Sequence, residues 1–446
     1  MTLELFPYQL HGAAFLAQRS RAGLFDDPGL GKSAQTIAAL DMINADKVLI
    51  VCPAAVREVW KGEFKKFGLR PRRVLKGDDI HHLNMWLKDR VDVLLCSYEM
   101  ATKWAPYILR HGDVFDAVVF DESHYLKSGS TKRSKALLGN KCDGKDGLMR
   151  FAARAWFLTG TPMSNDPMDI WTFLRASGST LLNRQAFQHR YFNTRNGAFS
   201  SRAHPKPSMV KELKACIASQ TLRRTQEDVG LELPPIWLTT QTVDGDTQEI
   251  RQLLREHPGL EKAVLDAVEK GGLSFLEGQS ISTLRRLVGE AKAPAFLSLL
   301  KEELQNGDHK IVVMGVHRAA LQIIRDGLTA SGIDCVHIDG QVGETDRVQA
   351  VKQFQNDPDC RVFVGNIRAA GTGLTLTAAS DLVLFESDWA PAANAQAIKR
   401  IHRIGQTSAC RARFITLANS IDEMVSKTVI SKTAAIAASG YKMTAA

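Results

Sequence analysis

The clearest chemistry in this sequence lies in a glycine-rich segment near the N-terminus. Asp26 to Ser33 reads DDPGLGKS and stands directly before a helix-forming segment. Backbone N–H groups in such a turn approach phosphate oxygens, and the start of a helix adds positive potential. We expect Gly29-Leu30-Gly31 to form this turn, Lys32 to reach the β and γ phosphates of ATP, and the Ser33 hydroxyl to bind Mg²⁺. Asp26 replaces the first glycine of the strict pattern, so a plain turn before an ordinary helix is the alternative.

Two adjacent carboxylates close the apolar segment DAVVF, in the sequence DESH. Acids at the end of a strand can place Asp121 beside Mg²⁺ and Glu122 beside the attacking water. An isolated pair of acids would be interpreted as solvated, but this pair follows a phosphate loop in the order that an ATP site requires. We therefore predict one ATP site built from both segments.

Three further polar residues have side chains suited to reading a nucleotide. Thr159 and Thr161 lie in LTGTP, after the next apolar segment, and are expected to sense whether a phosphate is present. A plain strand-end turn would suit this segment equally well. The amide of Gln9 in FPYQ both donates and accepts, which suits the edge of adenine. Tyr8 fits a contact with the base and a place in the core equally well.

Two arginines near the C-terminus supply guanidinium groups that the first segments of the ATP site lack. Arg400 and Arg403 in QAIKRIHRIGQ are three residues apart, which puts them on one face of a predicted helix. Guanidinium groups suit the charge spread over a transferring phosphoryl group. A solvated basic helix is the alternative, but the position at the end of a second α/β block favours catalysis.

The fold class predicted from the alternation of apolar and helix-length segments is α/β with parallel sheets. Each apolar segment ends in polar or glycine-containing residues, as strands that carry a site usually do. The predicted buried strands are 47–53, 91–99, 115–122 and 154–162 in a first block, and 310–317, 335–340, 361–366, 381–387 and 411–418 in a second.

Two or three domains are expected because 446 residues exceed a typical single domain. The consecutive prolines of Leu233-Pro234-Pro235 indicate the boundary, which gives lobes of residues 1–235 and 236–446. In the first lobe, residues 183–208 are expected to form an irregular, exposed insert. In the second, residues 247–305 are expected to be largely helical.

Composition narrows the class of protein. The net charge of +9 favours a polyanionic partner. The seven cysteines include no C-x-x-C pair, so a zinc site is not expected. No segment has the length of a membrane span, and the N-terminus lacks the pattern of a signal peptide. We expect a cytoplasmic, nucleoid-associated protein in a bacterial or phage context.

Taken in order, these segments resemble the SWI/SNF-type family of superfamily-two helicase-like ATPases. The resemblance runs from Leu5 to about Met424, and LRRTQEDVGLELPP and HRIGQ are its most specific segments. EAKAPAFLSLL, HIDGQV and GLTLTAAS are most similar to the HepA-related, annealing-helicase branch. The resemblance implies two RecA-like lobes around an ATP cleft, a groove for double-stranded DNA, and the motor core alone.

The resemblance also implies a role for each matching residue. Its ATP ligands would be Gln9, Asp27, Gly29 to Ser33 and Gln396, with Mg²⁺ on Ser33 and Asp121. Arg400 and Arg403 would act as finger and sensor, and Thr159, Thr161 and Gly373 would couple the ATP site to DNA. The expected contacts with the DNA backbone are Pro53, Ala54, Ser97, Tyr98, Gly315, His317, Arg368 and Thr372.

The favoured function is therefore an ATP-dependent translocase on double-stranded DNA. Backbone contacts would position it without reading base sequence, and ATP-driven closure of the lobes would move it. Remodelling, fork regression and strand annealing are the expected outcomes. A strand-separating DNA or RNA helicase is one alternative, and an inactive nucleic-acid-binding module is another.

Overall fold

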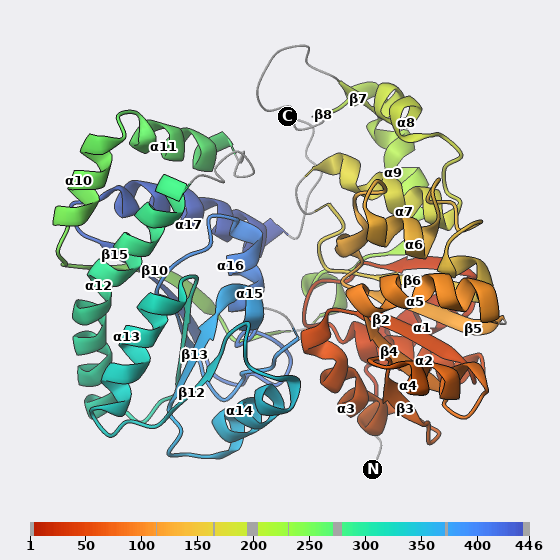
Figure 1. The fold of residues 1–446 in the computed structure, drawn as a ribbon, viewed down its shortest axis with the longest axis horizontal. Coiled ribbons are helices and arrows are strands. Elements are labelled where there is room, and N and C mark those ends of the chain that lie inside the picture. Colours follow the sequence, from red (N-terminus) through yellow and green to blue (C-terminus); the bar gives the residue numbers. More distant parts are fainter. Residues whose placement is uncertain are drawn as a thin grey trace. The chain divides into compact units, whose positions relative to one another are not determined.

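Two compact units make up the chain. The computed structural model describes residues 4–112, 114–163, 166–193, 204–230, 232–270, 279–370 and 373–439 (Figure 1). The first unit is Met1–Glu232 and the second is Leu233–Gly440, so the division falls next to the Pro234-Pro235 pair. Each unit is an α/β structure built on its own sheet. Among the described helices, none has the length and apolar character needed to cross a membrane.

The first unit is built on a seven-stranded sheet whose pairs are all parallel, in the order β3-β4-β2-β5-β6-β1-β9. Its strands are β1 (Arg21–Leu24), β2 (Val48–Cys52), β3 (Val74–Lys76), β4 (Val93–Ser97), β5 (Phe115–Asp121), β6 (Ala152–Leu158) and β9 (Thr221–Leu222). Its helices are α1 (Pro7–Ala17), α2 (Lys32–Met42), α3 (Arg57–Phe67), α4 (Ile80–Leu87), α5 (Tyr98–His111), α6 (Lys132–Leu138), α7 (Ile170–Ser177), α8 (Arg184–Tyr191) and α9 (Val210–Ala218).

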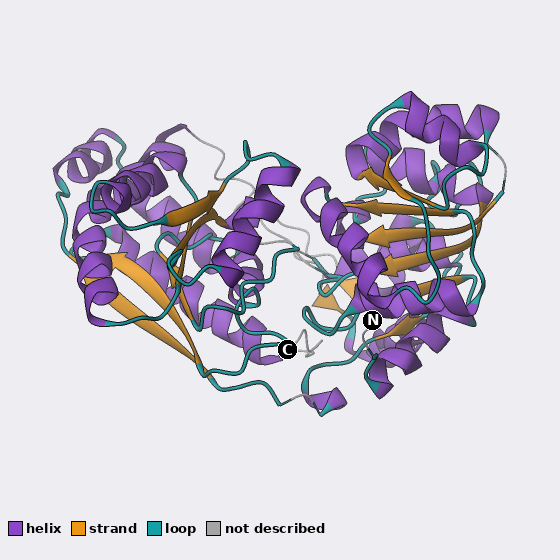
Figure 2. Ribbon diagram, turned by 90° about the horizontal axis from the view of Figure 1, so that it is seen from below, coloured by secondary structure: helices purple, strands orange, loops and turns teal. Residues whose placement is uncertain are grey.

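Alternate residues of the central strands supply two separate cores. Leu49 and Val51 join the cluster formed with α4 to α9, whereas Val48, Ile50 and Cys52 pack with α1, α2 and α3. Successive side chains of a strand point to opposite faces, and helices lie on both faces of this sheet (Figure 2). A strand buried in this way needs a continuous apolar run, which explains why β2 has the sequence VLIVC.

The second unit has a six-stranded parallel sheet in the order β10-β15-β14-β11-β13-β12. Its strands are β10 (Ile236–Val243), β11 (Ile311–Gly315), β12 (Cys335–Ile338), β13 (Val362–Asn366), β14 (Asp381–Leu384) and β15 (Cys410–Leu417). Its helices are α10 (Gln248–Glu256), α11 (Leu260–Lys270), α12 (Gln279–Asn306), α13 (Arg318–Thr329), α14 (Glu344–Asn356), α15 (Ile367–Ala370), α16 (Pro391–Ile398) and α17 (Ile421–Ser439).

The predicted α/β class with parallel sheets is confirmed, and a strand lies within or across each of the nine predicted ranges. Four described strands of the two parallel sheets were not predicted, namely β1, β3, β9 and β10. The first three are only two to four residues long, and β10 is an edge strand whose sequence, IWLTTQTV, is half polar. None of them has the apolar run on which the prediction depended.

Residues 183–208 differ from the prediction of an irregular, exposed insert. Residues 184–191 form α8, whose Phe187 and Tyr191 are buried in the core of the first unit together with Phe192. Aromatic residues at this spacing give the segment one apolar helix face, which outweighs its polar composition. A short antiparallel pair, β7 (Phe192–Asn193) and β8 (His204–Pro205), follows, and residues 194–203 lie outside the described part of the chain.

Candidate functional site

Three loops of the candidate site begin from one row of the first sheet. Leu24 of β1 is in register with Leu158 of β6, and Leu158 is in register with Asp121 of β5. The glycine-rich loop follows Leu24, the threonine loop follows Leu158, and the carboxylates end β5. Parallel strands collect such loops at their carboxyl ends, where ligands of open α/β sheets bind.

The glycine-rich loop has the backbone geometry of a phosphate-binding turn. Gly29 and Gly31 have positive φ values of 96° and 70°, which side chains rarely tolerate. Gly31 is the residue before α2, and no side chain caps the first N–H groups of that helix. These groups are therefore left for an anion. A Cβ atom on Gly31 would lie 2.3 Å from Nε2 of Gln9, so any larger residue would displace the Gln9 amide.

The N-terminal segment lies against this loop. Gln9 donates from Nε2 to the Leu30 carbonyl oxygen at 3.4 Å and accepts from the Phe6 N–H at 3.0 Å. The Tyr8 hydroxyl donates to the same Leu30 carbonyl at 3.3 Å. Burial and the charge of Asp26 raise the pKa of Tyr8 to about 12. The residue predicted to read adenine is thus held next to the residues predicted to hold phosphate.

Lys32 is held at the base of the loop. Its Nζ donates to the carbonyl oxygens of Asp26 at 2.8 Å and Asp27 at 3.3 Å. Burial lowers the pKa of Lys32, although nearby carboxylates, chiefly that of Glu122, act in the opposite direction. The predicted lysine, its two neighbouring aspartates and the DESH carboxylates therefore share one electrostatic environment.

Asp121 is fixed by two hydrogen bonds that leave part of its carboxylate available. Oδ2 accepts from Nε1 of Trp60 at 2.8 Å, and Oδ1 accepts from the Glu122 N–H at 2.9 Å. Burial and the charge of Glu122 raise the pKa of Asp121 to about 6. Carboxylate and hydroxyl oxygens are the hard donors that Mg²⁺ prefers, so Asp121 and Ser33 fit that ion. A divalent cation would also neutralise the excess negative charge that raises this pKa.

Glu122 has an unusual backbone conformation. Its φ of 52° and ψ of 49° are left-handed values that cost a non-glycine residue of the order of 1–3 kcal/mol. Such strain clusters at functional sites because the surrounding structure must hold it. This conformation starts the 3₁₀ turn Ser123–Leu126 directly after the strand, and it turns the chain toward the threonine loop.

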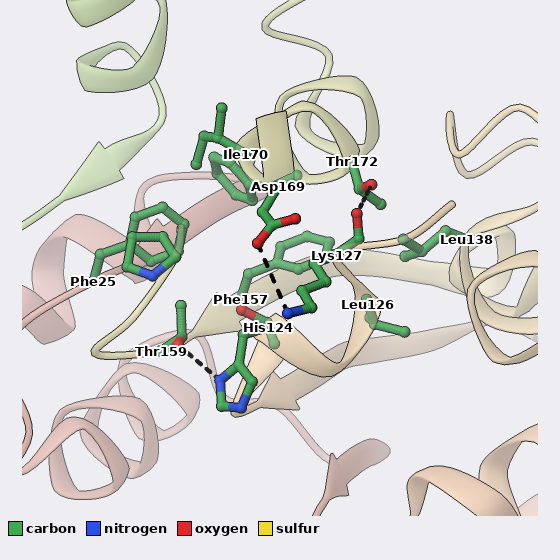
Figure 3. A pocket seen from close by; sticks show the side chains of 13 residues that line it. Phe25, His124, Leu126, Lys127, Leu138, Phe157, Thr159, Asp169, Ile170 and Thr172 are labelled. Carbon is green, nitrogen blue, oxygen red and sulfur yellow. Dashed lines mark hydrogen bonds and ion pairs between the residues drawn. The ribbon is translucent and has the colours of Figure 1, made fainter. Parts of the chain in front are cut away.

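His124 joins the carboxylates to the threonine loop, and Figure 3 shows its contact with Thr159. Its Nδ1 lies 3.2 Å from Oε2 of Glu122 and 3.3 Å from Oγ1 of Thr159. The Thr161 N–H donates to that same Thr159 oxygen at 3.0 Å. Beneath this junction is a pocket lined by the aromatic rings of Phe25, Phe157 and Phe173.

The threonine loop also touches the glycine-rich loop. A Cβ atom on Gly160 would lie 2.6 Å from ring carbons of Pro28. Thr159, Thr161, Glu122 and the glycine-rich loop are therefore linked by direct contacts, as a phosphate sensor requires. Trp60, His124 and Arg224 support these parts without a role assigned from the sequence. The only signal for Arg224 was its place in the specific segment LRRTQEDV.

The first-unit residues expected to meet DNA begin at the same sheet edge. Pro53 and Ala54 follow β2, Ser97 ends β4, and Cys52 is in register with Ser97. Ala54 is exposed, whereas Pro53 and Ser97 are buried. The Ser97 hydroxyl accepts from the Met100 N–H at 3.1 Å and caps α5, so neither Pro53 nor the Ser97 side chain has the exposed surface that the predicted DNA contact needs. The strands that carry ATP-site loops and those that carry these loops are thus neighbours in one sheet.

Tyr98 differs from its prediction as a DNA contact. Its side chain is fully buried, stacks on Tyr125 with ring centroids 5.1 Å apart, and donates to the Asp121 carbonyl oxygen at 2.9 Å. A ring without exposed surface is not available to a DNA backbone. Tyr98 supports the end of the carboxylate strand instead.

In the second unit, the prediction that Arg400 and Arg403 lie on one helix is wrong. Helix α16 ends at Ile398, and both arginines lie in the turns that follow. Their side chains nevertheless converge, because Nη1 of Arg400 and Nη1 of Arg403 donate to the Leu374 carbonyl oxygen at 3.2 and 3.1 Å. The shared Leu374 carbonyl, and not the spacing of a helix, brings the two guanidinium groups together.

Further hydrogen bonds fix this arginine loop, residues 399–406, against residues 374–379. The Leu376 N–H donates to the Arg400 carbonyl oxygen at 2.9 Å. Gln406, which is buried, donates from Nε2 to the carbonyl oxygens of Ala379 at 2.8 Å and Ile401 at 3.1 Å. Gln406 closes the loop that HRIGQ forms.

The other residues predicted to act with this loop lie next to it in the sequence or beside residues that contact it. The Gln396 carbonyl oxygen accepts from Nε of Arg400 at 3.0 Å, so its main chain supports the arginine. Gly373, the predicted coupling residue, precedes Leu374 and has a φ of 73°. Thr372 lies outside the described residues.

The other second-unit residues expected to meet DNA follow strand ends and are oriented by acids. Gly315 ends β11, and His317 after it lies with Nδ1 2.7 Å from Oε1 of the buried Glu386. Arg368 extends from α15, and its Nε lies 3.2 Å from Oδ2 of Asp388 while the rest of the side chain remains exposed. Carboxylates therefore hold both basic side chains at the carboxyl ends of the strands.

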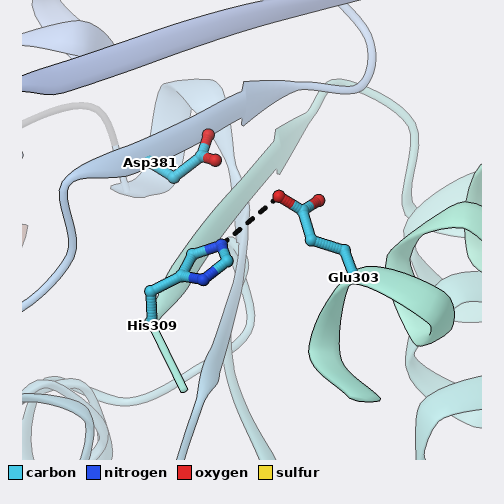
Figure 4. A group of neighbouring side chains, drawn as sticks. All are labelled: Glu303, His309 and Asp381. Carbon is cyan, nitrogen blue, oxygen red and sulfur yellow. Dashed lines mark hydrogen bonds and ion pairs between the residues drawn. The ribbon is translucent and has the colours of Figure 1, made fainter. Parts of the chain in front are cut away.

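One further group has the residue types of a metal centre. Glu303, His309 and Asp381 place their ligand atoms within 4.8 Å of one another (Figure 4). The same carboxylates are occupied by arginines, with Nη1 of Arg413 2.8 Å from Glu303 and Nε of Arg411 3.1 Å from Asp381. Two guanidinium groups compensate the two acids, so this cluster is an ion-pair network apart from the predicted site.

A glycine–lysine loop, a carboxylate pair and two parallel α/β units define a phosphate-loop protein of the two-lobed class. The chain belongs to the SNF2-related family. Residues 8–276 match the SNF2-related domain, and residues 292–405 match the helicase conserved C-terminal domain. The SWI/SNF-type resemblance drawn from the sequence is therefore confirmed.

Several characterised proteins are similar to nearly all of this chain. The DNA annealing helicase and endonuclease ZRANB3 is 29% identical over 432 residues in Homo sapiens and 31% over 447 residues in Mus musculus. Each match covers 95% of this chain and 39% of the relative. The SWI/SNF-related matrix-associated actin-dependent regulator of chromatin subfamily A-like protein 1 of Drosophila melanogaster is 27% identical, covering 95% of this chain and 54% of the relative.

These relatives agree with the predicted annealing-helicase branch, and the chain spans between two fifths and just over half of their lengths. A solved structure, the Sulfolobus solfataricus SWI2/SNF2 ATPase core in complex with dsDNA, is also similar. It is 22% identical, with a TM-score of 0.45, over 99% of this chain and 94% of that chain.

Proposed function

We propose that this protein is an ATP-dependent translocase on double-stranded DNA, with ATP and Mg²⁺ as its cofactors. The observation that carries the proposal is the row formed by Leu24, Leu158 and Asp121, which starts all three nucleotide loops at one sheet edge. A family of helicase-like ATPases provides the context. Binding elements alone would not require a strained glutamate next to the metal-ligand candidate.

Within the first unit, each side chain has a distinct role in this proposal. The N–H groups of Gly29 to Ser33 and Nζ of Lys32 bind the phosphates, and Gln9 meets the base. Ser33 and Asp121 hold Mg²⁺, which when bound neutralises charge on the β and γ phosphates. Glu122 orients the water and accepts its proton, and His124 and Thr159 hold Glu122 in place.

The second unit supplies Arg400 and Arg403 to the transferring phosphoryl group. Their two guanidinium groups already share one acceptor, so they can approach an anion together. Closure of the lobes, residues 1–235 and 236–446, around ATP would exchange the Leu374 carbonyl for phosphate oxygens. Repeated closure and opening would move the protein along DNA.

Double-stranded DNA is the proposed partner because the candidate DNA loops lie at the carboxyl ends of parallel strands, as the candidate ATP loops do. In the first unit they follow β2 and β4, and in the second they include Gly315, His317 and Arg368. Both family matches and the names of the relatives, such as DNA annealing helicase, support this choice. Contacts with phosphates would make binding independent of base sequence.

Remodelling, fork regression or strand annealing is the proposed outcome of movement. A cytoplasmic, nucleoid-associated setting in a bacterium or phage is part of the same proposal. The similar proteins named above are from animals, and their origin lends no support to that setting.

The test is an ATPase assay with double-stranded, single-stranded, forked and RNA substrates across a salt series. We expect stimulation by double-stranded DNA that weakens as salt rises, because phosphate contacts release counterions. Lys32→Ala and Glu122→Gln should fall to background rates, while Lys88→Ala and Glu249→Gln, at exposed positions, should match the wild type. Undiminished rates in the first two variants would reject the assigned roles.

A second assay separates the proposal from a strand-separating helicase. Displacement of one strand from a partial duplex is measured in the presence of a protein trap. We expect little displacement together with strong stimulation by duplex. Robust unwinding, and stimulation by single strands in place of duplex, would favour the helicase.

A further inference from the structure

A buried arginine of the first unit contacts three segments of the proposed ATP site that precede the carboxylates. Arg224 follows β9 and is 8% exposed. Its Nε donates to Oδ1 of Asp26 at 3.1 Å, and its Nη2 donates to Oε1 of Gln35 at 2.8 Å. Its Nη1 donates to the Tyr8 carbonyl oxygen. One side chain thus joins the adenine segment, the glycine-rich loop and helix α2.

The partners of Arg224 are buried and tied to one another. Asp26 and Gln35 have no exposed surface. Gln35 donates from Nε2 to Oδ2 of Asp26 at 3.1 Å and to the Leu30 carbonyl oxygen at 3.0 Å. Both carboxylate oxygens of Asp26 are therefore occupied, and the network reaches the middle of the glycine-rich loop.

The main chain continues the same connection. The Asp27 N–H donates to the Arg224 carbonyl oxygen at 3.0 Å, and the Phe25 N–H donates to the Leu222 carbonyl oxygen at 2.8 Å. The pairing of β1 with β9 is thereby extended into the start of the glycine-rich loop. Residues 225–232 then lead to the second unit.

Helix α1 leaves room for this network through a glycine. A Cβ atom on Gly12 would lie 1.7 Å from Oε1 of Gln35 and 2.7 Å from Nη2 of Arg224. Gly12 is inside a helix, where glycine is less favourable than alanine. Helix α1 therefore contains a residue of low helix propensity at the point where the side chains of Arg224 and Gln35 lie against it.

We propose that Arg224 is a positioning residue that preorganises the glycine-rich loop and the Gln9 segment for ATP. The inference rests on the proposed ATP site and deepens it. The mechanism is thermodynamic. Without the arginine, the binding-competent loop is only a fraction of the population, and apparent affinity falls by that fraction while bound ATP still orders the loop.

The consequence is a split between KM and kcat. A lysine at position 224 keeps the charge but loses the planar fork that bonds three partners at once. We expect Arg224→Lys to raise the KM for ATP, and the Kd of a fluorescent ATP analogue, roughly tenfold. The kcat at saturating ATP and DNA should change less than twofold. Gly12→Ala should shift KM in the same direction by displacing Gln35, without altering any ATP ligand.

A double variant distinguishes positioning from mere support of the fold. Replacing both partners of a buried ion pair by apolar residues can restore stability that single replacements lose. We expect Arg224→Met to lower the melting temperature, and Asp26→Leu with Arg224→Met to recover most of it while the KM for ATP stays high. The control is Arg190→Met, which removes an exposed arginine that makes a similar two-bond contact with Glu212.

The outcomes are separable. An unchanged Kd in Arg224→Lys, or a double variant that recovers both stability and KM, would overturn the positioning role. The binding measurement needs no DNA, so wild-type protein that binds ATP without DNA stimulation would reject the translocase proposal and leave this inference standing. Wild-type protein that does not bind the analogue at all would reject both.

Discussion

The carboxylate and glycine-rich loops of the first unit and the arginine loop of the second unit are held in place in different ways. In the first unit, Asp121 and the glycine-rich loop start from registered positions in a parallel sheet, and a buried network ties the loop to Arg224. In the second unit, Arg400 and Arg403 lie in turns after α16 and share the Leu374 carbonyl. In the proposed function, the first-unit loops are ordered without ATP, whereas the arginine loop would have to exchange a main-chain partner in order to act.

This difference shows how a motor can separate binding from chemistry. Loops that start from paired strands are already ordered, so little further ordering free energy is lost when the ligand binds. The first unit can therefore supply binding affinity. Loop hydrogen bonds between the arginines and a carbonyl are each worth only about 1.5–3 kcal/mol, as bonds to charged groups usually are. They can therefore be replaced by contacts with a phosphoryl group during turnover.

The largest effect should come from the arginine loop. We expect Arg403→Ala to lower kcat about 1,000-fold with little change in the KM for ATP, as loss of a transition-state arginine does. Steady-state ATPase with saturating duplex measures both parameters. Arg255→Ala, which removes an arginine on α10, serves as the control. A kcat within tenfold of the wild type, or a rise in KM alone, would place Arg403 among the binding residues. The proposed division between binding in the first unit and catalysis in the second would then be wrong.

A second prediction concerns what holds that loop. Gln406→Ala removes the donor to the buried carbonyl oxygens of Ala379 and Ile401, and unsatisfied buried groups cost about 1–3 kcal/mol each. We expect a melting temperature several degrees lower, with kcat reduced because the arginines lose their alignment. Gln252→Ala, at an exposed glutamine, is the matched variant. Normal stability together with normal kcat would show that the loop does not depend on Gln406.

A third prediction tests whether the first unit depends on the conformation of its glycine-rich loop. Alanine at Gly31 must adopt a left-handed conformation, which costs roughly 1–2 kcal/mol, and its Cβ would collide with the Gln9 amide. We expect the KM for ATP to rise about tenfold. Gly62→Ala is the comparison, since a Cβ atom there meets nothing within 4 Å. Equal KM values in the two variants would contradict a requirement for this loop geometry.

The smallest effect should be a pH dependence of stability in the second unit. Burial raises the pKa of Glu386, but hydrogen bonds and charge from His317 outweigh it and leave the pKa below its usual value. The ionised carboxylate therefore stabilises the fold above the ordinary glutamate pKa of about 4.3, and this stability is lost as pH falls through the lower folded value.

Thermal unfolding of the wild type and Glu386→Gln between pH 7 and pH 3 measures this contribution. The difference in melting temperature should be largest at pH 7 and should shrink under acid. Glu249→Gln, at an exposed glutamate, should show no such trend. A constant difference for Glu386→Gln across the range would indicate that the carboxylate charge contributes nothing.

Long apolar runs and the glycine-rich motif were sufficient to predict much of the first unit. VLIVC and FDAVVFD can only be buried strands, because both faces of each are apolar. The prediction missed β1, which has the sequence RAGL, because four residues with a glycine give no periodicity. Its strand character comes from pairing with β6 and β9, partners that lie more than 130 residues away.

The errors have the same origin. Arg400 and Arg403 were expected on one face of a predicted helix, but α16 ends at Ile398, and the distant Leu376 donates its N–H to the Arg400 carbonyl oxygen in the turns that follow. Tyr98 was expected to contact DNA because of the family resemblance, but its ring is buried and packs on Tyr125. In each case a residue distant in sequence decided the local structure.

The sequence by itself determined the chemistry available: a phosphate loop, a carboxylate pair and a pair of arginines, in an order that belongs to one family. Those properties are local, because backbone freedom, charge and hydrogen-bonding capacity follow from residue type. Only the tertiary structure decided that Arg224 stands behind the glycine-rich loop, that Glu122 is left-handed and that one carbonyl collects both arginines. These arrangements arise from contacts between segments far apart in the chain, and no local pattern encodes them.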